Sequence, residues 1–144
     1  RIEYVIADAE IDLARGNTNR AVATLERRLE LSPGNHPLTM SYAHALQQAG
    51  SPHMAEAVLI DQSRRMPNDP GLWYLLAEVQ GLAGNIVGLH RSRAEYFILI
   101  NALDVAERQL TYAQNGVGSD FTTSSLINQR MRDIQDMRAE MDRG

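Results

Sequence analysis

Several residue types in this chain recur at intervals of 34 positions. Glycines keep that interval, and so do several alanines, leucines and prolines. The matching sets are Gly16, Gly50 and Gly84; Ala9, Ala43 and Ala77; Ala21 and Ala55; Leu25 and Leu59; Pro33 and Pro67. A fixed period of a few tens of residues is typical of proteins in which one supersecondary unit stacks on the next. The interval therefore predicts a repeat architecture.

Each period has the pattern of two helices joined by a turn. Apolar residues recur at helical spacing in every row. The periodic glycine ends the first helix of each pair, because glycine readily adopts the positive φ found just past a helix end. Ser51-Pro52 and Asp69-Pro70 each place an N-cap residue before a proline at the first helical position. The predicted repeats span about 2–35, 36–69 and 70–103.

The register shifts by half a period near residues 86–100. With this shift, Ala94 becomes the small residue of a first helix, Asn101 takes the turn, and Ala106 follows in a second helix. The remaining helices are predicted over about 103–115 and 121–142. The whole chain, 1–144, is predicted to form one domain of this kind.

The last predicted helix has one apolar and one charged side. Its apolar stripe comprises Leu126, Ile127, Met131, Ile134, Met137 and Met141. Its other side carries Arg130, Arg132, Asp133, Asp136 and Arg138. One buried and one solvated face are what a helix that caps a repeat array needs.

The pattern resembles the tetratricopeptide repeat, a helix–turn–helix unit of the same length. Trp73, Leu76-Ala77 and Gly84 match the first-helix signature of that family closely. From the period and the resemblance we expect an all-α, right-handed superhelical solenoid without strands. It should contain about eight antiparallel helices, ending in a C-terminal capping helix.

Composition excludes several classes of function. The chain has no cysteine, which rules out thiol nucleophiles, cysteine-ligated zinc, iron–sulfur clusters and disulfides. It also has no lysine, and its formal net charge is −4, so we expect no nucleic-acid partner. No apolar run is long enough to span a membrane.

The histidines do not have the spacing of a zinc site. They are His36, His44, His53 and His90. A zinc-binding helix of the HExxH type needs two histidines four positions apart with a glutamate between them. Glycine-rich phosphate loops and the G-x-S-x-G nucleophile motif are also absent. We therefore expect no catalytic residue, metal ligand or cofactor in this chain.

Stacked helix pairs form an extended concave surface, which the first helices line. The positions three before and one after each periodic alanine should face it. They are Ile6 and Glu10, Met40 and His44, and Tyr74 and Glu78, with Arg91 predicted at the rim. A mixed apolar and polar surface suits an extended or helical peptide. The alternative for each residue is an exposed position with no ligand.

Some tetratricopeptide domains clamp a C-terminal carboxylate with lysine and asparagine side chains on this surface. Here the corresponding places carry Ile6 and Glu10, and the chain has no lysine. We therefore predict against carboxylate clamping.

A narrower resemblance lies in the segment from Gly88 to Phe97 and in Leu103-Asp104-Val105-Ala106. These residues are similar to the C-terminal tail of periplasmic zinc metalloproteases, in which an HExxH peptidase domain precedes tetratricopeptide repeats. The resemblance implies a bacterial hydrolase in the periplasm, with zinc in a peptidase domain outside this chain. The implied partners are that peptidase domain, the outer-membrane barrel-assembly machinery and unfolded outer-membrane proteins.

Two alternatives remain open at this point. The chain begins with Arg1 rather than Met, so we expect it to be a fragment of a longer protein. A stand-alone repeat adaptor in envelope or pilus assembly, with no attached enzyme, is the second hypothesis. A chain that is itself catalytic is the third, and no motif favours it. An HExxH sequence upstream of Arg1 would separate the first hypothesis from the second.

Overall fold

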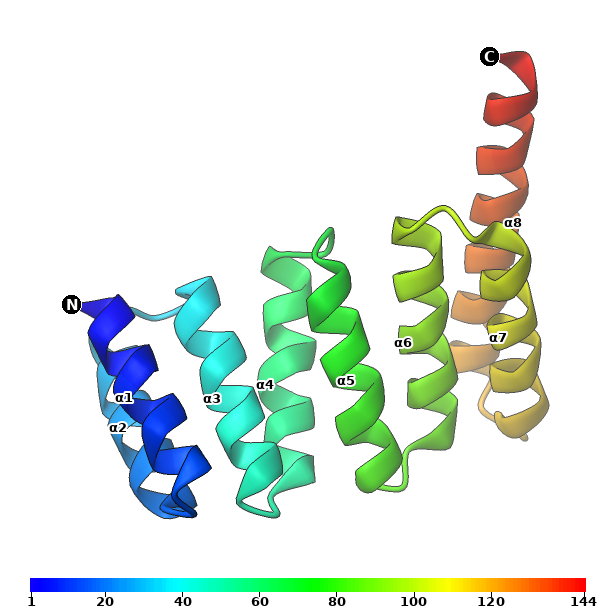
Figure 1. Cartoon of the computed structure of the whole chain (residues 1–144). Helices are drawn as coiled ribbons and strands as arrows, with labels where there is room; N and C mark the ends of the chain where they lie inside the picture. Colours follow the sequence, from blue (N-terminus) through cyan, green and yellow to red (C-terminus); the bar gives the residue numbers. More distant parts are fainter. The chain divides into compact units, whose positions relative to one another are not determined.

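The computed structural model describes residues 1–144 as eight α-helices with no strand, which confirms the predicted all-α class (Figure 1). The chain divides into two compact units, residues 1–67 and 68–144. The first unit contains α1 (Ile2–Ala14), α2 (Thr18–Leu31), α3 (His36–Gln48) and α4 (Pro52–Arg65). The second contains α5 (Pro70–Leu82), α6 (Ile86–Leu99), α7 (Leu103–Gly116) and α8 (Phe121–Arg143).

In the first unit each helix packs against the next in sequence, and α1 also contacts α3. The alanines of the 34-residue period lie where these helices meet. Ala9 and Ala21 are almost fully buried, and so are Ala43 and Ala55. Small side chains let the helix axes approach closely, because no bulk stands between the backbones. The periodic positions therefore set the helix spacing.

Comparing equivalent repeat positions also shows which face of α1 is exposed to solvent. Tyr4 on α1 and Leu38 on α3 lie 34 residues apart and so occupy the same place in successive repeats. Leu38 is fully buried, whereas Tyr4 keeps 68% of its exposure. Helices α1 and α2 both contact α3. The same helical position is thus core in α3 and surface in α1.

The turns between paired helices use left-handed backbone, as the sequence predicts. Gly16, Gly50 and Gly84 have φ of 81°, 77° and 79°. Asn101 takes the corresponding turn between α6 and α7 with φ of 64° and is the one non-glycine residue at positive φ. Asparagine tolerates this region better than other side chains because its short amide can hydrogen-bond locally.

Helix starts are fixed by polar side chains at four places. Asn35, Asp69, Asn85 and Asp120 each accept a hydrogen bond from a backbone N–H of the first turn of the following helix. Ser51 also occupies the N-cap position, before Pro52, but its side chain makes no capping hydrogen bond. At this helix start, the fixed φ of Pro52 favours the helical conformation.

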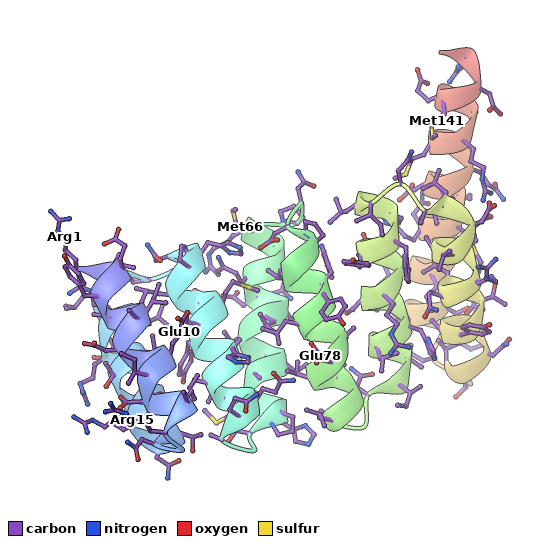
Figure 2. The ribbon with its side chains drawn as sticks, viewed as in Figure 1. Arg1, Glu10, Arg15, Met66, Glu78 and Met141 are labelled. Carbon is purple, nitrogen blue, oxygen red and sulfur yellow. The ribbon has the colours of Figure 1, made fainter.

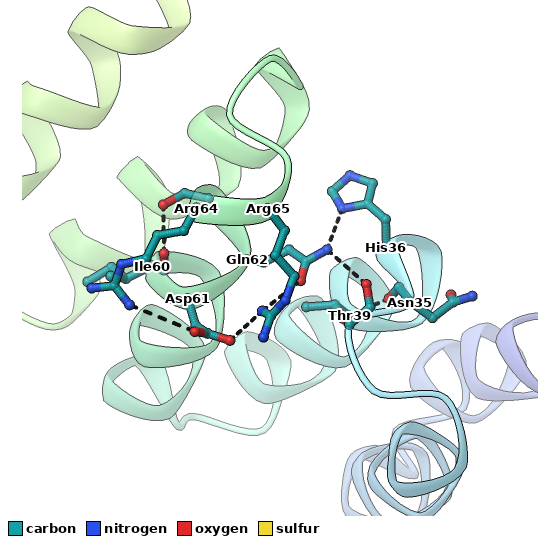
Figure 3. A network of polar contacts seen from close by, with 10 residues as sticks. Asn35, His36, Thr39, Ile60, Asp61, Gln62, Arg64 and Arg65 are labelled. Carbon is teal, nitrogen blue, oxygen red and sulfur yellow. Dashed lines mark hydrogen bonds and ion pairs between the residues drawn. The ribbon is translucent and has the colours of Figure 1, made fainter.

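A buried glutamine joins α4 to the loop between α2 and α3 (Figure 3). Gln62 is 1% exposed, and its Nε2 donates to the carbonyl oxygen of Gly34 at 3.3 Å. The same nitrogen lies 3.0 Å from Nδ1 of His36. These contacts satisfy a polar group that would otherwise be costly to bury.

The second unit packs α5 on α6, α6 on α7 and α7 on α8. Its core comprises Ala94, Leu103, Ala106, Leu110, Ala113, Ile127 and Ile134. Only part of the apolar stripe predicted on α8 is buried. Ile127 and Ile134 are in the core and Met131 and Met137 pack against it. Leu126 and Met141, however, keep 52% and 54% of their exposure.

No helix of the chain is both long and apolar enough to cross a membrane.

Candidate functional site

Four of the residues predicted to bind a partner lie in the first unit, on helices that contact each other. Ile6 and Glu10 lie on α1, and Met40 and His44 lie on α3. Glu10 and His44 are exposed, while Ile6 and Met40 are partly buried. Glu10 is marked on its helix in Figure 2. These four positions are at least partly accessible to solvent.

Two more predicted residues, Tyr74 and Glu78, lie together in the second unit. They line a hollow of about 130 Å³ between α5 and α6. Its other lining residues are Ala77, Arg93, Tyr96 and Phe97. Each helix contributes positions i, i+3 and i+4, which share one face of an α-helix. We call this feature the α5–α6 hollow.

Aromatic rings form the wall of the α5–α6 hollow. The rings of Tyr74 and Tyr96 meet edge to face, with centroids 5.6 Å apart and planes at 61°. Tyr96 meets Phe97 in the same manner at 5.3 Å and 78°. Edge-to-face contact is a favourable arrangement for such pairs. Tyr74 nevertheless keeps 58% of its exposure, so much of its ring is available to a ligand.

Two opposite charges stand at the hollow, one on each helix. Glu78 on α5 and Arg93 on α6 are both exposed, and neither forms an ion pair or a hydrogen bond within the chain. The neighbouring Glu95 is different, because Arg130 on α8 binds its carboxylate at 2.8 Å. The hollow is therefore apolar inside and carries one free acceptor and one free donor group at its edge.

Arg91, the seventh predicted residue, does not line the α5–α6 hollow. Its positive charge acts instead on Asp120, the N-cap of α8, and helps to lower the pKa of that carboxyl. The largest contribution to the lowered pKa is the hydrogen bond from the side chain of Thr123. Arg91 thus belongs to a different part of the second unit.

Sequence reasoning missed three residues of the hollow: Arg93, Tyr96 and Phe97. Arg93 has the character of an ordinary solvated charge in the sequence, and the two aromatic residues lie where the 34-residue register slips. Their i, i+3, i+4 spacing was the available signal. It mirrors the spacing of Tyr74, Ala77 and Glu78 on the preceding helix.

No group of three or more His, Asp or Glu side chains is placed to hold a metal ion.

Comparison with known proteins finds a family of repeats that matches part of the chain. The tetratricopeptide repeat model matches residues 12–79. The chain is also 29% identical, over 114 residues, to proteins named β-barrel assembly-enhancing protease from Escherichia coli strain K12 and Shigella flexneri. The match covers 79% of this chain but 23% of the length of these relatives.

Tetratricopeptide repeats bind other proteins on the surfaces that their stacked helices create. The match to this family and the accessible α5–α6 hollow agree with that role. The repeats matched over residues 12–79 therefore imply protein–protein interaction.

Proposed function

We propose that this chain, whose residues 12–79 belong to the tetratricopeptide repeat family, is the protein-binding part of a periplasmic zinc metallopeptidase. The observation that carries the proposal is the 29% identity to β-barrel assembly-enhancing proteases over 79% of the chain. Those relatives are much longer, so the peptidase residues and the zinc would belong to a segment outside this chain. In this proposal the parent protein acts in the assembly and quality control of outer-membrane proteins.

The partner would be an unfolded outer-membrane protein or a component of the barrel-assembly machinery. In the first unit it would contact Ile6, Met40 and His44, and in the second unit it would contact Tyr74. Tyr74 is the strongest single candidate among these residues. A tyrosine offers a large contact area at low conformational-entropy cost, and more than half of this side chain is accessible.

Photocrosslinking tests the binding surface. A photoreactive residue is placed at Tyr74 in one protein and at Met137 on α8 in another. Each is irradiated with an unfolded outer-membrane protein. We expect adducts from position 74. Adducts from position 137 and none from position 74 would overturn the surface and favour α8 as the docking helix.

A pair of double variants supplies the matched control. Tyr74→Ala with Met40→Glu should weaken capture of the unfolded protein and leave the far-UV spectrum unchanged. Tyr4→Ala with Met54→Glu changes the same residue types at exposed positions outside the proposed surface. It should leave capture at the wild-type level. Equal loss of capture in both double variants would contradict the proposal.

The link to a peptidase is tested on the gene itself. The proposal expects an HExxH sequence in the same reading frame, upstream of the codon for Arg1. Its absence would leave a repeat module without an attached enzyme.

A further inference from the structure

The α5–α6 hollow combines an apolar interior with two unpaired charges, and this combination limits what it can bind. An apolar cavity of about 150 Å³ accommodates one benzene molecule. The hollow measures about 130 Å³ and is walled by Tyr74, Tyr96 and Phe97. Its size and lining therefore suit one aromatic ring, which would add an edge-to-face partner to rings already arranged in that way.

The charges at the hollow complement a peptide main chain. A carboxylate such as Glu78 only accepts hydrogen bonds, and a guanidinium such as Arg93 only donates them. Each residue of a peptide offers one N–H donor and one C=O acceptor. A residue whose side chain enters the hollow would place both groups at its edge, where Glu78 and Arg93 stand on opposite helices.

The same complementarity excludes a helical ligand. In an α-helix the N–H and C=O groups of a residue are already bonded within the helix. Only an extended or unfolded segment leaves them free for Glu78 and Arg93.

We infer that the α5–α6 hollow binds extended polypeptide segments through one aromatic side chain, whose own main-chain N–H donates to Glu78 and whose C=O accepts from Arg93. This inference rests on the proposed function and deepens it, since it names the class of segment that the module takes. Recognition of one ring and the main chain around it sets no demand on the flanking side chains. Many different unfolded sequences would therefore bind.

A series of short peptides tests the inference. The probe is N-acetyl-Ser-Thr-Phe-Thr-Ser-amide, titrated into the whole 144-residue chain. Binding is followed through the Ala77 methyl signal by nuclear magnetic resonance, because Ala77 lines the hollow. Replacing the central residue of the peptide by alanine should raise Kd at least about tenfold, since the buried ring is lost.

Methylation of the central peptide nitrogen removes the proposed donor to Glu78 without any change to the protein. It should weaken binding to the wild-type chain about tenfold, as expected for a hydrogen bond to a charged group. In Glu78→Ala, methylation should have no further effect. Arg93→Ala should weaken binding by a similar factor. Glu30→Ala and Arg108→Ala remove exposed charges outside the hollow and should leave Kd unchanged.

Three results would overturn the inference: equal affinity for the phenylalanine and alanine peptides, indifference to N-methylation, or tighter binding of a helix-constrained peptide. The capture experiment at Tyr74 keeps the two proposals apart. If the peptide series fails while unfolded protein still crosslinks at position 74, the inference is wrong and the proposed function stands. If crosslinking at position 74 fails as well, the inference and the proposed binding surface are both wrong.

Discussion

Arg130 on α8 binds the carboxylate of Glu95 on α6 through two contacts, Nε to Oε2 at 2.9 Å and Nη2 to Oε1 at 2.8 Å. The two side chains keep 32% and 22% of their exposure. The hydrogen bond with Glu95 raises the pKa of Arg130 above its ordinary value. A bidentate pair fixes orientation as well as distance. It therefore sets where the long helix α8 lies against α6.

The pair predicts a measurable coupling between the two helices. Arg130→Ala and Glu95→Ala, alone and together, should give a coupling free energy of about 1 to 2 kcal/mol, because the ions are partly shielded from water. Urea denaturation measures it. The exposed pair Glu140 and Arg143 supplies the comparison, for which about 0.5 kcal/mol or less is expected. Equal couplings would show that Glu95 and Arg130 are no better shielded in solution.

Leu38 and Tyr4 occupy the same repeat position but differ in burial. Truncation to alanine should therefore affect the free energy of unfolding strongly at one and weakly at the other. Leu38→Ala should lower the free energy of unfolding by about 2 to 5 kcal/mol, because it leaves a cavity in the core. Tyr4→Ala, at the matching place on α1, should change it by about 0.5 kcal/mol or less. Denaturant titration of both variants is the measurement. Similar losses in the two variants would mean that Tyr4 is covered in solution.

The turn at Asn101 predicts a rescue by glycine. A side chain at positive φ costs roughly 1 to 2 kcal/mol unless it bonds locally, as asparagine can. Asn101→Ala should therefore lower the melting temperature, while Asn101→Gly should keep or raise it. A lower melting temperature in the glycine variant than in the alanine variant would contradict the assigned backbone.

The start of α8 should be sensitive to acid. Asp120 accepts hydrogen bonds from the backbone nitrogen and the hydroxyl of Thr123, and these lower the pKa of Asp120 below its ordinary value. A carboxyl with a lowered folded-state pKa contributes stability above the unfolded value of about 3.9. That contribution is lost as the pH falls through the folded pKa. The protection of the Thr123 amide against hydrogen exchange, taken relative to an unstructured peptide at the same pH, should therefore fall below about pH 4.

Asp120→Asn is the control for this acid response. Asparagine caps a helix about as well as aspartate but does not titrate in this range. The variant should keep the protection of the Thr123 amide nearly constant between pH 6 and pH 3. A parallel acid response in the variant would point to another group.

The sequence predicted the helix pairs well because their ends need particular residues. Glycine at Gly16, Gly50 and Gly84 supplies a backbone conformation that few other residues adopt. Periodic alanines mark where helices meet, and they are buried. Both signals are local, so they can be recognised without knowing the fold. Asn101 was recognisable for the same reason, once the half-period shift was allowed.

The α5–α6 hollow could be only half predicted, because it depends on which faces of two helices oppose each other. Tyr74 and Glu78 follow from the period, whereas Tyr96 and Arg93 lie on a helix whose register has slipped. Spacing on one helix does not indicate what stands across from it.

The sequence also did not predict that the C-terminal end of α8 is exposed, because this depends on the lengths of two helices. Helix α8 has 23 residues and α7 has 14, about 34 Å against 21 Å at the rise of an α-helix. Met141 lies in the part that extends past α7, as Figure 2 shows. An apolar stripe predicts which face is inward but not how far the supporting helix reaches.

The division into two units, each made of helices that pack on their neighbours in sequence, bears on how the chain is synthesised. Contacts between residues close in sequence form quickly, because little loop entropy is lost when they close. The first unit ends at Pro67. Its internal contacts can therefore form while the ribosome is still translating the second half. Apolar faces within that unit are then covered in nearly the order in which they emerge, which shortens the time available for aggregation.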